Sequence, residues 1–378
     1  MKALVPTGRV RSPVEFAEVD EPVPRADEAV VAVAAFFDDP EMLPGFVVLA
    51  RSRAVAAGLD PNQYAAVTSG LASLYDWPAA FRQAGRDHLS IAERAEAAGR
   101  TVSAGEAYHD AALWFHFATT IPHPDRRGHA ESADAMRRAL THLDPTFERV
   151  DGGDFVGTLR RPGGVEAPPV VLVIPGMDSG KEEFHSITES LLRRGMATLA
   201  LDGPGQGELA TRSAPEPDYQ KVTSAAIDAI AGRGDLDTRR IGAIALSLGG
   251  FYGAMSLAAE PRIRSGVVVS GAWAIDWDML PPFVTETLTL RTGSADAARA
   301  FARRVDLTGV AERIRQPLLV VDGGQDVIPG CVNGEPLARR APNGEYLRVP
   351  EGDHLVGNAR WKWLPAAADR LAHHLTDH

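Results

Sequence analysis

The segment 245–250, ALSLGG, places a serine with small residues two positions before and two positions after it. The apolar run 241–245 predicts a strand before Ser247, and 251–259 continues at helical spacing. Such a strand-to-helix turn holds a serine in a strained backbone conformation with its hydroxyl clear of the sheet, where it can act as a nucleophile. Ala245 stands where the usual G-x-S-x-G pattern has its first glycine. An ordinary small-residue turn would give the same pattern, so the other residues must decide.

A serine hydroxyl is a weak nucleophile at neutral pH, so Ser247 needs a general base and an acid that orients the base. In a doubly wound sheet these groups follow later strands in the order Ser, Asp, His. Asp326 follows a buried strand and a glycine-rich turn, and His354 comes after the next strand. Asp322 is the alternative acid, although a carboxylate at the edge of its strand can simply cap the turn. We therefore expect Ser247, Asp326 and His354 to form a catalytic triad.

Two backbone N–H groups must also face the oxyanion that forms when Ser247 attacks a carbonyl. Leu248 directly follows the serine and is expected to supply one of them. Met177, in the loop after the first buried strand of the sheet, is expected to supply the other. Its neighbours Gly176 and Asp178 are candidate substrate-pocket residues.

The segment 202–208, DGPGQGE, raises the alternative of a dinucleotide-binding loop. Its glycines have G-x-G-x-G spacing, Pro204 lies among them, and no helix opens directly after them. The spacing argues against phosphate binding, and no cofactor is expected. No metal is expected either, because the histidines of the helical region lack ligand spacing with carboxylates or cysteines. These histidines are His109, His116, His123 and His129.

The composition narrows the partners and the compartment. The chain has 378 residues and a net charge of −11, with 39 basic and 50 acidic side chains. This charge repels nucleic-acid phosphates and anionic lipid, so the expected partner is a small-molecule substrate, not nucleic acid or a membrane. Cys331 is the single cysteine and allows no internal disulfide. No apolar run reaches the roughly 18 residues of a membrane span, and no signal peptide is recognisable. A cytoplasmic protein is the simple expectation.

From Phe147 onward apolar strands alternate with helical stretches, which predicts an α/β domain over 147–378 with a mostly parallel, doubly wound sheet. Residues 271–312 interrupt this alternation. The expected strands are 154–160, 170–174, 197–201, 241–245, 267–269, 318–321 and 346–349. The expected helices are 182–194, 219–231, 251–259, 335–340 and 362–375.

Residues 37–146 are predicted to form a separate helical cap domain. Apolar residues recur there at spacings of three and four, with breaks at 58–61, Gly99 and 122–124, which indicates roughly four to six helices. Aromatic residues are frequent in this region, and Trp114 is a candidate pocket residue. Bulk at helical spacing more often belongs to a core than to a pocket.

Residues 1–36 alternate β-formers with glycine and proline breaks and predict a short β-rich leader. The wording MKALVPTGR and VEFAEVDEPVPRADEAVVAV resembles the opening strands of medium-chain quinone reductases and alcohol dehydrogenases. No zinc-ligand cluster or nicotinamide fingerprint follows, so we expect an appendage without that chemistry. An oxidoreductase that binds NAD(P)H is the alternative.

Five segments together resemble the α/β-hydrolase fold. In chain order they read PGMDSGKEEFH, LDGPGQGE, ALSLGGFYGAMSLAAEPRI, GGQDVIP and GDH. They resemble most the group that contains 2,6-dihydroxypseudooxynicotine hydrolase, fungal polyketide-shortening hydrolases and FrsA-like proteins, which carries an N-terminal helical cap. The resemblance covers about residues 40–376. It implies the nucleophile, acid and base at Ser247, Asp326 and His354, and the oxyanion donors at Met177 and Leu248.

The resemblance also implies a reaction class. The best-known members of this group cleave a C–C bond next to a ketone in a retro-Claisen sense and are dimers, so a homodimer is expected. The C–C hydrolase named above has a further functional glutamate after the strand that follows the serine. Here that segment offers Asp276 and Asp278 as pocket candidates, and no glutamate occurs before Glu286.

We therefore expect a cofactor-independent serine hydrolase that cleaves a C–C bond next to a ketone in a bulky aromatic or polyketide-like substrate. A carboxylesterase or lactonase of the same fold is the first alternative. A non-catalytic, FrsA-like binding protein is the second.

Overall fold

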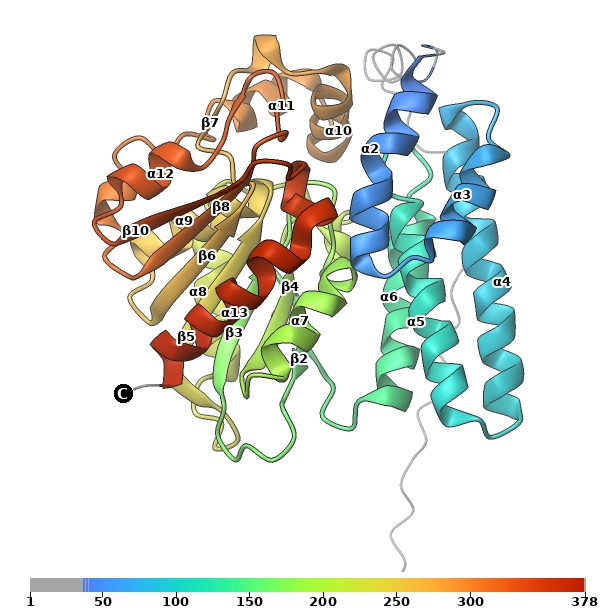
Figure 1. Ribbon diagram of the computed structural model, residues 1–378, viewed down its shortest axis with the longest axis horizontal. Helices are drawn as coiled ribbons and strands as arrows, with labels where there is room; N and C mark the ends of the chain where they lie inside the picture. The colour runs from blue at the N-terminus through green and yellow to red at the C-terminus, as the bar shows by residue number, and fades with distance from the viewer. Residues whose placement is uncertain (1–36, 38, 40, 377–378) are drawn as a thin grey trace, which may run out of the picture.

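The computed structural model describes residues 37, 39 and 41–376. The β-rich, reductase-like leader expected over 1–36 lies outside these residues. The described chain has two parts that lie side by side (Figure 1). One part is helical up to Leu143, and the other is a sheet with helices on both faces that starts at Glu148.

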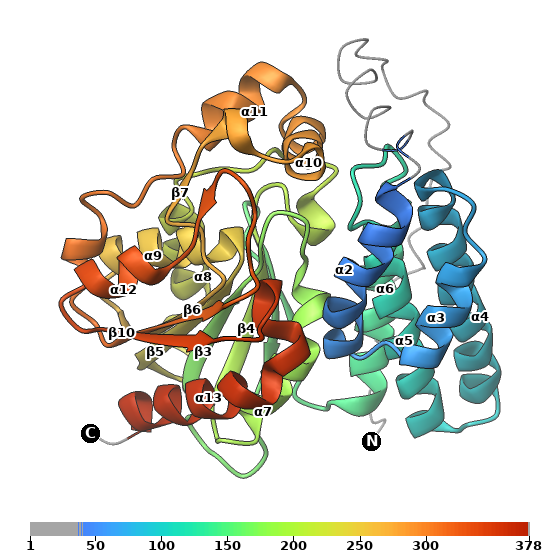
Figure 2. The same cartoon turned by 45° about the horizontal axis from the view of Figure 1, so that its top comes forward.

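A glycine and an aspartate set the boundary between the first two helices of the helical part. Gly58 ends the first long helix with a φ of 131°, which a residue with a side chain rarely adopts. Asp60 begins the next helix because its carboxylate accepts the N–H groups of Asn62 and Gln63, both at 2.8 Å. Helices α2 and α6 face the sheet, and α3 and α4 lie farther from it (Figures 1 and 2). The bounds are α2 (Met42–Ala57), α3 (Pro61–Ser69), the 3₁₀ turn η1 (Leu74–Asp76), α4 (Trp77–Ala97), α5 (Thr101–Phe117) and α6 (Arg127–Leu143).

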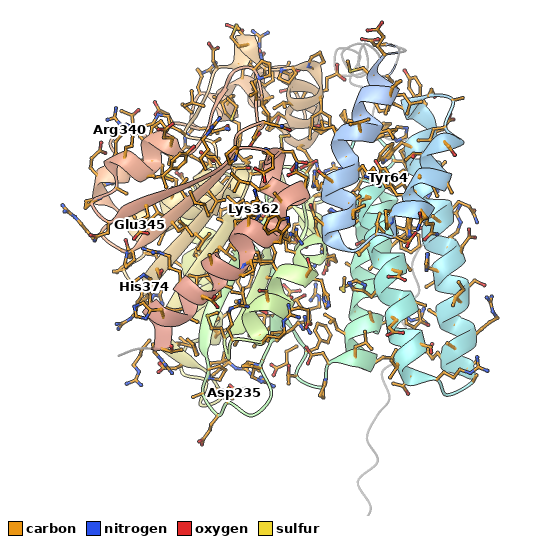
Figure 3. The ribbon with its side chains drawn as sticks, viewed as in Figure 1. Tyr64, Asp235, Arg340, Glu345, Lys362 and His374 are labelled. Atoms are coloured by element: carbon orange, nitrogen blue, oxygen red, sulfur yellow. The ribbon has the colours of Figure 1, made fainter. Side chains whose placement is uncertain are left out.

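Aromatic side chains fill the interior of the helical part. The ring of Phe81 stacks on Trp77 with centroids 4.1 Å apart and packs against Trp114 at 5.2 Å. Tyr64 lies in the same interior (Figure 3), and its hydroxyl donates to the carbonyl of Val47 at 2.9 Å. Trp114 is only 1% exposed. Trp114 therefore belongs to the core of the helical part, the alternative to a pocket role that its helical spacing favours.

An eight-stranded sheet forms the second part, in the order β1-β2-β4-β3-β5-β6-β8-β10. Strand β2 pairs antiparallel with β1 and β4, and every other neighbouring pair is parallel. Strands β3 and β4 are buried at every position, as apolar strands covered on both faces must be. The bounds are β1 (Glu148–Asp151), β2 (Val156–Arg160), β3 (Pro169–Ile174), β4 (Ala197–Asp202), β5 (Asp237–Leu246), β6 (Ile263–Val269), β8 (Leu318–Gly323) and β10 (Gly344–Val349).

Helices cover the two faces of this sheet in separate groups. Helices α7 (His185–Leu192) and α13 (Arg360–Thr376) pack on one face. Helices α8 (Gln220–Ile230), α9 (Leu248–Ala259) and α12 (Glu335–Arg340) pack on the other. The expected α/β fold with a mostly parallel, doubly wound sheet is therefore confirmed.

The excursion expected over 271–312 carries two helices, α10 (Pro282–Thr292) and α11 (Ala295–Ala302). A small antiparallel pair, β7 (Ala274–Ile275) and β9 (Cys331–Val332), ties its start to the chain after β8. Helix α10 lies beside α2 of the helical part (Figures 1 and 2), where the rings of Phe283 and Phe46 are 5.3 Å apart.

Among the differences from the expected elements, two have clear local reasons. Strand β1 is not among the expected strands. It is a half-exposed edge strand of four residues, which is too short to give a clear alternating pattern. The expected helix 182–194 divides into the 3₁₀ turn η2 (Lys181–Phe184) and α7, because the first turn is held by buried ion pairs. None of the described helices combines the length and apolarity needed to cross a bilayer.

Candidate active site

Ser247 lies at the turn between β5 and α9, where the motif predicts it. Its φ of 58° and ψ of −131° belong to a strained conformation that costs roughly 1–3 kcal/mol. A Cβ atom on Gly249 would lie 2.5 Å from the carbonyl oxygens of Ile174 and Pro175, so only glycine lets the helix approach β3 this closely. The turn therefore presents the hydroxyl at the carboxyl end of the parallel strands.

The methyl group of Ala245, which replaces the first glycine of the usual pattern, is accommodated by α9. A Cβ atom on Gly253 would lie 2.5 Å from the Cβ of Ala245. The helix thus lacks a side chain where the strand carries one, and the two elements keep their close approach.

His354 connects Ser247 to Asp326. Its Nε2 lies 2.9 Å from the Oγ of Ser247, and its Nδ1 lies 3.0 Å from both carboxylate oxygens of Asp326. The three side chains follow β5, β8 and β10, whose carboxyl ends share one edge of the sheet. This arrangement can pass the serine proton to the imidazole while the carboxylate holds the tautomer with a proton on Nδ1.

Close backbone packing brings the loops of Asp326 and His354 together. A Cβ atom on Gly323 would lie 2.4 Å from the carbonyl oxygens of Gly352 and Asp353. The glycine at the end of β8 is therefore needed for contact between the two loops and not only for the reversal of the chain.

The turn after His354 is strained. Leu355 and Val356 have φ angles of 67° and 48°, which are rare for side chains of this size. The Oγ of Ser270, at the end of β6, accepts the N–H of Leu355 at 2.9 Å. This bond helps to hold the turn in the conformation that directs the imidazole toward Ser247.

Asp322, the alternative acid, lies within β8 and is 1% exposed. Burial raises its pKa to about 6, and the negative charge of Asp326 contributes to the shift. Both contacts of the imidazole Nδ1 are made to Asp326. The geometry therefore favours Asp326 as the partner of His354.

The surroundings of His354 raise its pKa above the ordinary value of 6.5. Burial of the ring lowers the pKa, but the adjacent carboxylate of Asp326 outweighs this effect. Arg53 lowers the pKa and Asp178 raises it. The protonated imidazole is therefore more favoured here than in an unperturbed histidine.

The loop after β3 lies against the serine. A Cβ atom on Gly176 would be 2.9 Å from the Cβ of Ser247 and 3.3 Å from its Oγ. Met177 follows in this loop, and Leu248 is the first residue of α9, so its N–H has no partner within the helix. The structure thus brings both expected oxyanion donors to the nucleophile's side of the sheet.

Residues 170–376, more than half of the chain, match the family described as "Alpha/beta hydrolase family". The chain belongs to the alpha/beta hydrolase family. Together with its named hydrolase relatives, this membership makes the protein a hydrolase.

This α/β-hydrolase is similar to 2,6-dihydropseudooxynicotine hydrolase of Paenarthrobacter nicotinovorans, with 33% identity over 248 residues. That alignment covers 63% of this chain and 68% of the relative. Hydrolase LUC6 of a Fusarium species is 30% identical over 222 residues, 52% of each chain. Among solved structures, 2,6-dihydroxy-pseudo-oxynicotine hydrolase matches with a TM-score of 0.78 and 27% identity, over 86% of this chain and 96% of that one. This coverage is too large for the sheet domain alone, so the match includes the helical part.

Gln206, which sequence reasoning did not single out, supports the loop of the α/β-hydrolase that carries Met177. Its Nε2 donates to the carbonyls of Pro175 at 2.7 Å and Gly176 at 3.0 Å. Its Oε1 accepts the N–H of Gly203 at 2.9 Å and the hydroxyl of Tyr219 at 2.8 Å. The glycine-rich segment 202–208 therefore supports the active-site loop, a role that its spacing does not signal.

Arg53 of α2 is the second residue that sequence reasoning missed. Its guanidinium donates to Glu183 at 2.6 and 2.8 Å, to Asp178 at 2.7 Å and to the Oγ of Ser179 at 3.0 Å. His116 of α5 lies 3.0 Å from the same Glu183 carboxylate. Asp178, an expected pocket residue, is thus ion-paired with the helical part of the hydrolase. No short sequence motif around Arg53 predicts its contacts with residues 125 to 130 positions later in the chain.

In the described part of the chain, three carboxylates lie close enough together to hold a cation. They belong to Glu182, Asp202 and Glu208. The Nζ of Lys181 lies 2.7, 2.8 and 2.7 Å from an oxygen of each. The ammonium group therefore already supplies the positive charge that these carboxylates need. A cavity of about 340 Å³ lies between this group and α6. Its lining includes none of Ser247, Asp326 and His354.

Asp276 and Asp278, the pocket candidates after β6, lie at an exposed turn. Both are exposed, and the carboxylate of Asp276 begins the 3₁₀ turn η4 (Trp277–Met279) by accepting the N–H of Asp278 at 3.2 Å. Glu286 on α10 is instead 4% exposed, and its Oε2 has no hydrogen-bond partner among the described residues. Burial raises the pKa of Glu286 to about 7.

Proposed function

We propose that this hydrolase is a cofactor-independent serine hydrolase with Ser247 as nucleophile, His354 as base and then acid, and Asp326 as the orienting acid. The observation that supports this proposal most directly is the pair of contacts made by the imidazole of His354. Its Nε2 lies 2.9 Å from the serine Oγ, and its Nδ1 lies 3.0 Å from the Asp326 carboxylate. The amides of Met177 and Leu248 are the proposed oxyanion donors.

The reaction proceeds in two halves. The Oγ of Ser247 adds to the substrate carbonyl while its proton passes to Nε2 of His354. The tetrahedral intermediate collapses, the scissile bond breaks, and the leaving group takes the proton from the imidazolium. A water molecule that His354 deprotonates then adds to the acyl-serine, and Ser247 leaves with the proton returned to it.

The proposed scissile bond is a C–C bond next to a ketone, in a β-diketone or in a ring acylated beside a phenol. Its leaving group is an enolate or a stabilised carbanion, which must receive a proton at carbon. The raised pKa of His354 favours a protonated imidazole at this step. Similarity to 2,6-dihydropseudooxynicotine hydrolase along most of both chains supports this class over a carboxylesterase or lactonase, the second candidate.

The deciding experiment offers the purified protein aryl β-diketones and acyl phenols beside matched esters and lactones. We expect turnover of the ketones, and a loss of roughly 10⁴–10⁶-fold in kcat for Ser247→Ala. Turnover of esters alone would make the protein an esterase, and activity in Ser247→Ala would refute the proposed nucleophile.

A fluorophosphonate probe tests the nucleophile without a known substrate. We expect it to label wild type at Ser247 and to leave Ser247→Ala unlabelled. A folded wild-type protein that neither reacts with the probe nor turns over a substrate would support the non-catalytic alternative. The expected homodimer and cytoplasmic location stay predictions.

A further inference from the structure

Two adjacent residues of α2 contact two different loops of the candidate site. Arg53 holds the loop that follows β3, through Asp178, Ser179 and Glu183. Ser52 donates its hydroxyl proton to a carboxylate oxygen of Asp353, the residue before His354. One turn of a helix in the helical part therefore reaches both the oxyanion side and the base side of Ser247.

The Arg53 contacts bear directly on Met177. Gly176 and Asp178 flank this residue, and each is held by a different part of the protein. Gln206 holds the carbonyl of Gly176 from inside the sheet domain, at 3.0 Å. Arg53 holds the carboxylate of Asp178 from the helical part, at 2.7 Å. The two anchors therefore act on the residues directly before and after Met177.

The Arg53 side chain is 16% exposed, and its positive charge is retained there. Burial lowers the pKa of the guanidinium, but the charges of Asp178 and Glu183 outweigh burial and raise it above its usual value. A charged, planar group that donates to two carboxylates and a hydroxyl restricts the loop in more than one direction.

The Ser52 contact bears on His354. One oxygen of the Asp353 carboxylate accepts the N–H of Gly357 at 2.9 Å and so caps the strained turn after the histidine. The other oxygen accepts the hydroxyl of Ser52. The serine therefore holds the carboxylate that keeps this turn closed.

We propose that Arg53 and Ser52 are positioning residues, through which docking of the helical part sets the direction of the Met177 amide and of the His354 imidazole. The inference rests on the proposed function, because it concerns the same nucleophile, base and oxyanion donors. It assigns the helical part a role in the chemical step besides that of covering the site.

The test compares kcat and KM of four variants on a substrate that wild type turns over. Arg53→Met should lower kcat on the order of 10²–10³-fold, as loss of an oxyanion donor does, with little change in KM. Arg53→Lys should recover part of the loss, because the ammonium group keeps the positive charge but lacks the planar, forked geometry with which the guanidinium contacts Glu183, Asp178 and Ser179 together. Ser52→Ala should give a smaller loss in kcat. Arg51→Met, an exposed neighbour on α2, is the matched control and should behave as wild type.

The pH profile separates positioning from the electrostatic effect of the Arg53 charge on His354. Asp326, Asp178 and Arg53 are the charged groups that shift the pKa of His354. Arg53 lowers that pKa, and its removal also leaves Asp178 unpaired, so both effects raise it. The acid limb of kcat/KM should therefore move to higher pH in Arg53→Met and stay in place in Arg51→Met. Arg53→Lys keeps the positive charge, so its acid limb should stay near that of wild type; a lower kcat in this variant then comes from the lost geometry and not from the missing charge.

The outcomes distinguish this inference from the proposed function. If the fluorophosphonate probe does not label wild type at Ser247, the proposed function fails and this inference fails with it. If wild type is labelled and Arg53→Met has the wild-type labelling rate, kcat and pH profile, only the positioning role is refuted. Should Arg53→Met not fold, Arg53→Lys and Ser52→Ala decide: unchanged kcat in both refutes the proposal.

Discussion

Both carboxylate oxygens of Asp326 lie 3.0 Å from Nδ1 of His354, whereas Asp322, four positions earlier, is enclosed in strand β8. Asp326→Asn should lower kcat on the order of 10⁴-fold, because an amide cannot hold the required tautomer or stabilise the imidazolium. Asp322→Asn should retain most of the activity. Steady-state kinetics of both folded variants check this prediction, and a larger loss in Asp322→Asn would reassign the acid.

The pH dependence of the hydrolase should follow His354. The general base must be neutral to accept the serine proton, and its pKa lies above 6.5 because the Asp326 charge outweighs burial. Activity should therefore fall as pH drops through a midpoint above 6.5. In Asp326→Asn the residual rate should show a lower midpoint. The rate of fluorophosphonate labelling between pH 5 and pH 9 measures both, and an identical midpoint in the two proteins would contradict the prediction.

Lys181 should be important for stability. Its ammonium lies within 2.8 Å of three carboxylates. Lys181→Met would leave Glu182 and Asp202 without their cation, whereas Glu208 would keep Arg149 at 2.9 Å. Loss of one partner from a buried ion group costs about 3–5 kcal/mol in the free energy of unfolding. Urea denaturation at pH 7 measures this loss. The control is Lys221→Met, on the exposed side of α8, which should change the free energy by at most about 0.5 kcal/mol.

Glu286 should make stability depend on pH. Its pKa is raised from an ordinary value of 4.5 to about 7, so the folded state binds the proton more tightly than the unfolded state. Between these values the free energy of unfolding must fall as pH rises. Glu286→Gln removes this loss, so its melting temperature should exceed that of wild type at pH 8 and differ little at pH 4.5. Equal melting temperatures of wild type and Glu286→Gln at pH 8 would contradict the raised pKa of Glu286. The control is Glu106→Gln, at an exposed site on α5, which should match wild type at both pH values.

The sequence alone determined the fold class, the place of Ser247 at a strand-to-helix turn and the order of the candidate triad. These features have local causes: buried strands of β-branched residues, a serine between small residues, and glycine turns after strands. Each can be recognised within about ten residues. For the same reason the excursion at 271–312 and the breaks near Gly58 and Gly99 agree with the observed elements.

Only the tertiary structure decided which side chains meet. It placed Trp114 in a core and Asp276 on an exposed turn, where sequence had suggested a pocket. It also brought Arg53 to Glu183, 130 residues later in the chain, and Ser52 to Asp353, 301 residues later. Such contacts follow from how the helical part packs against the sheet domain. Helical periodicity indicates that a face is buried, but it does not specify the surface against which that face is buried.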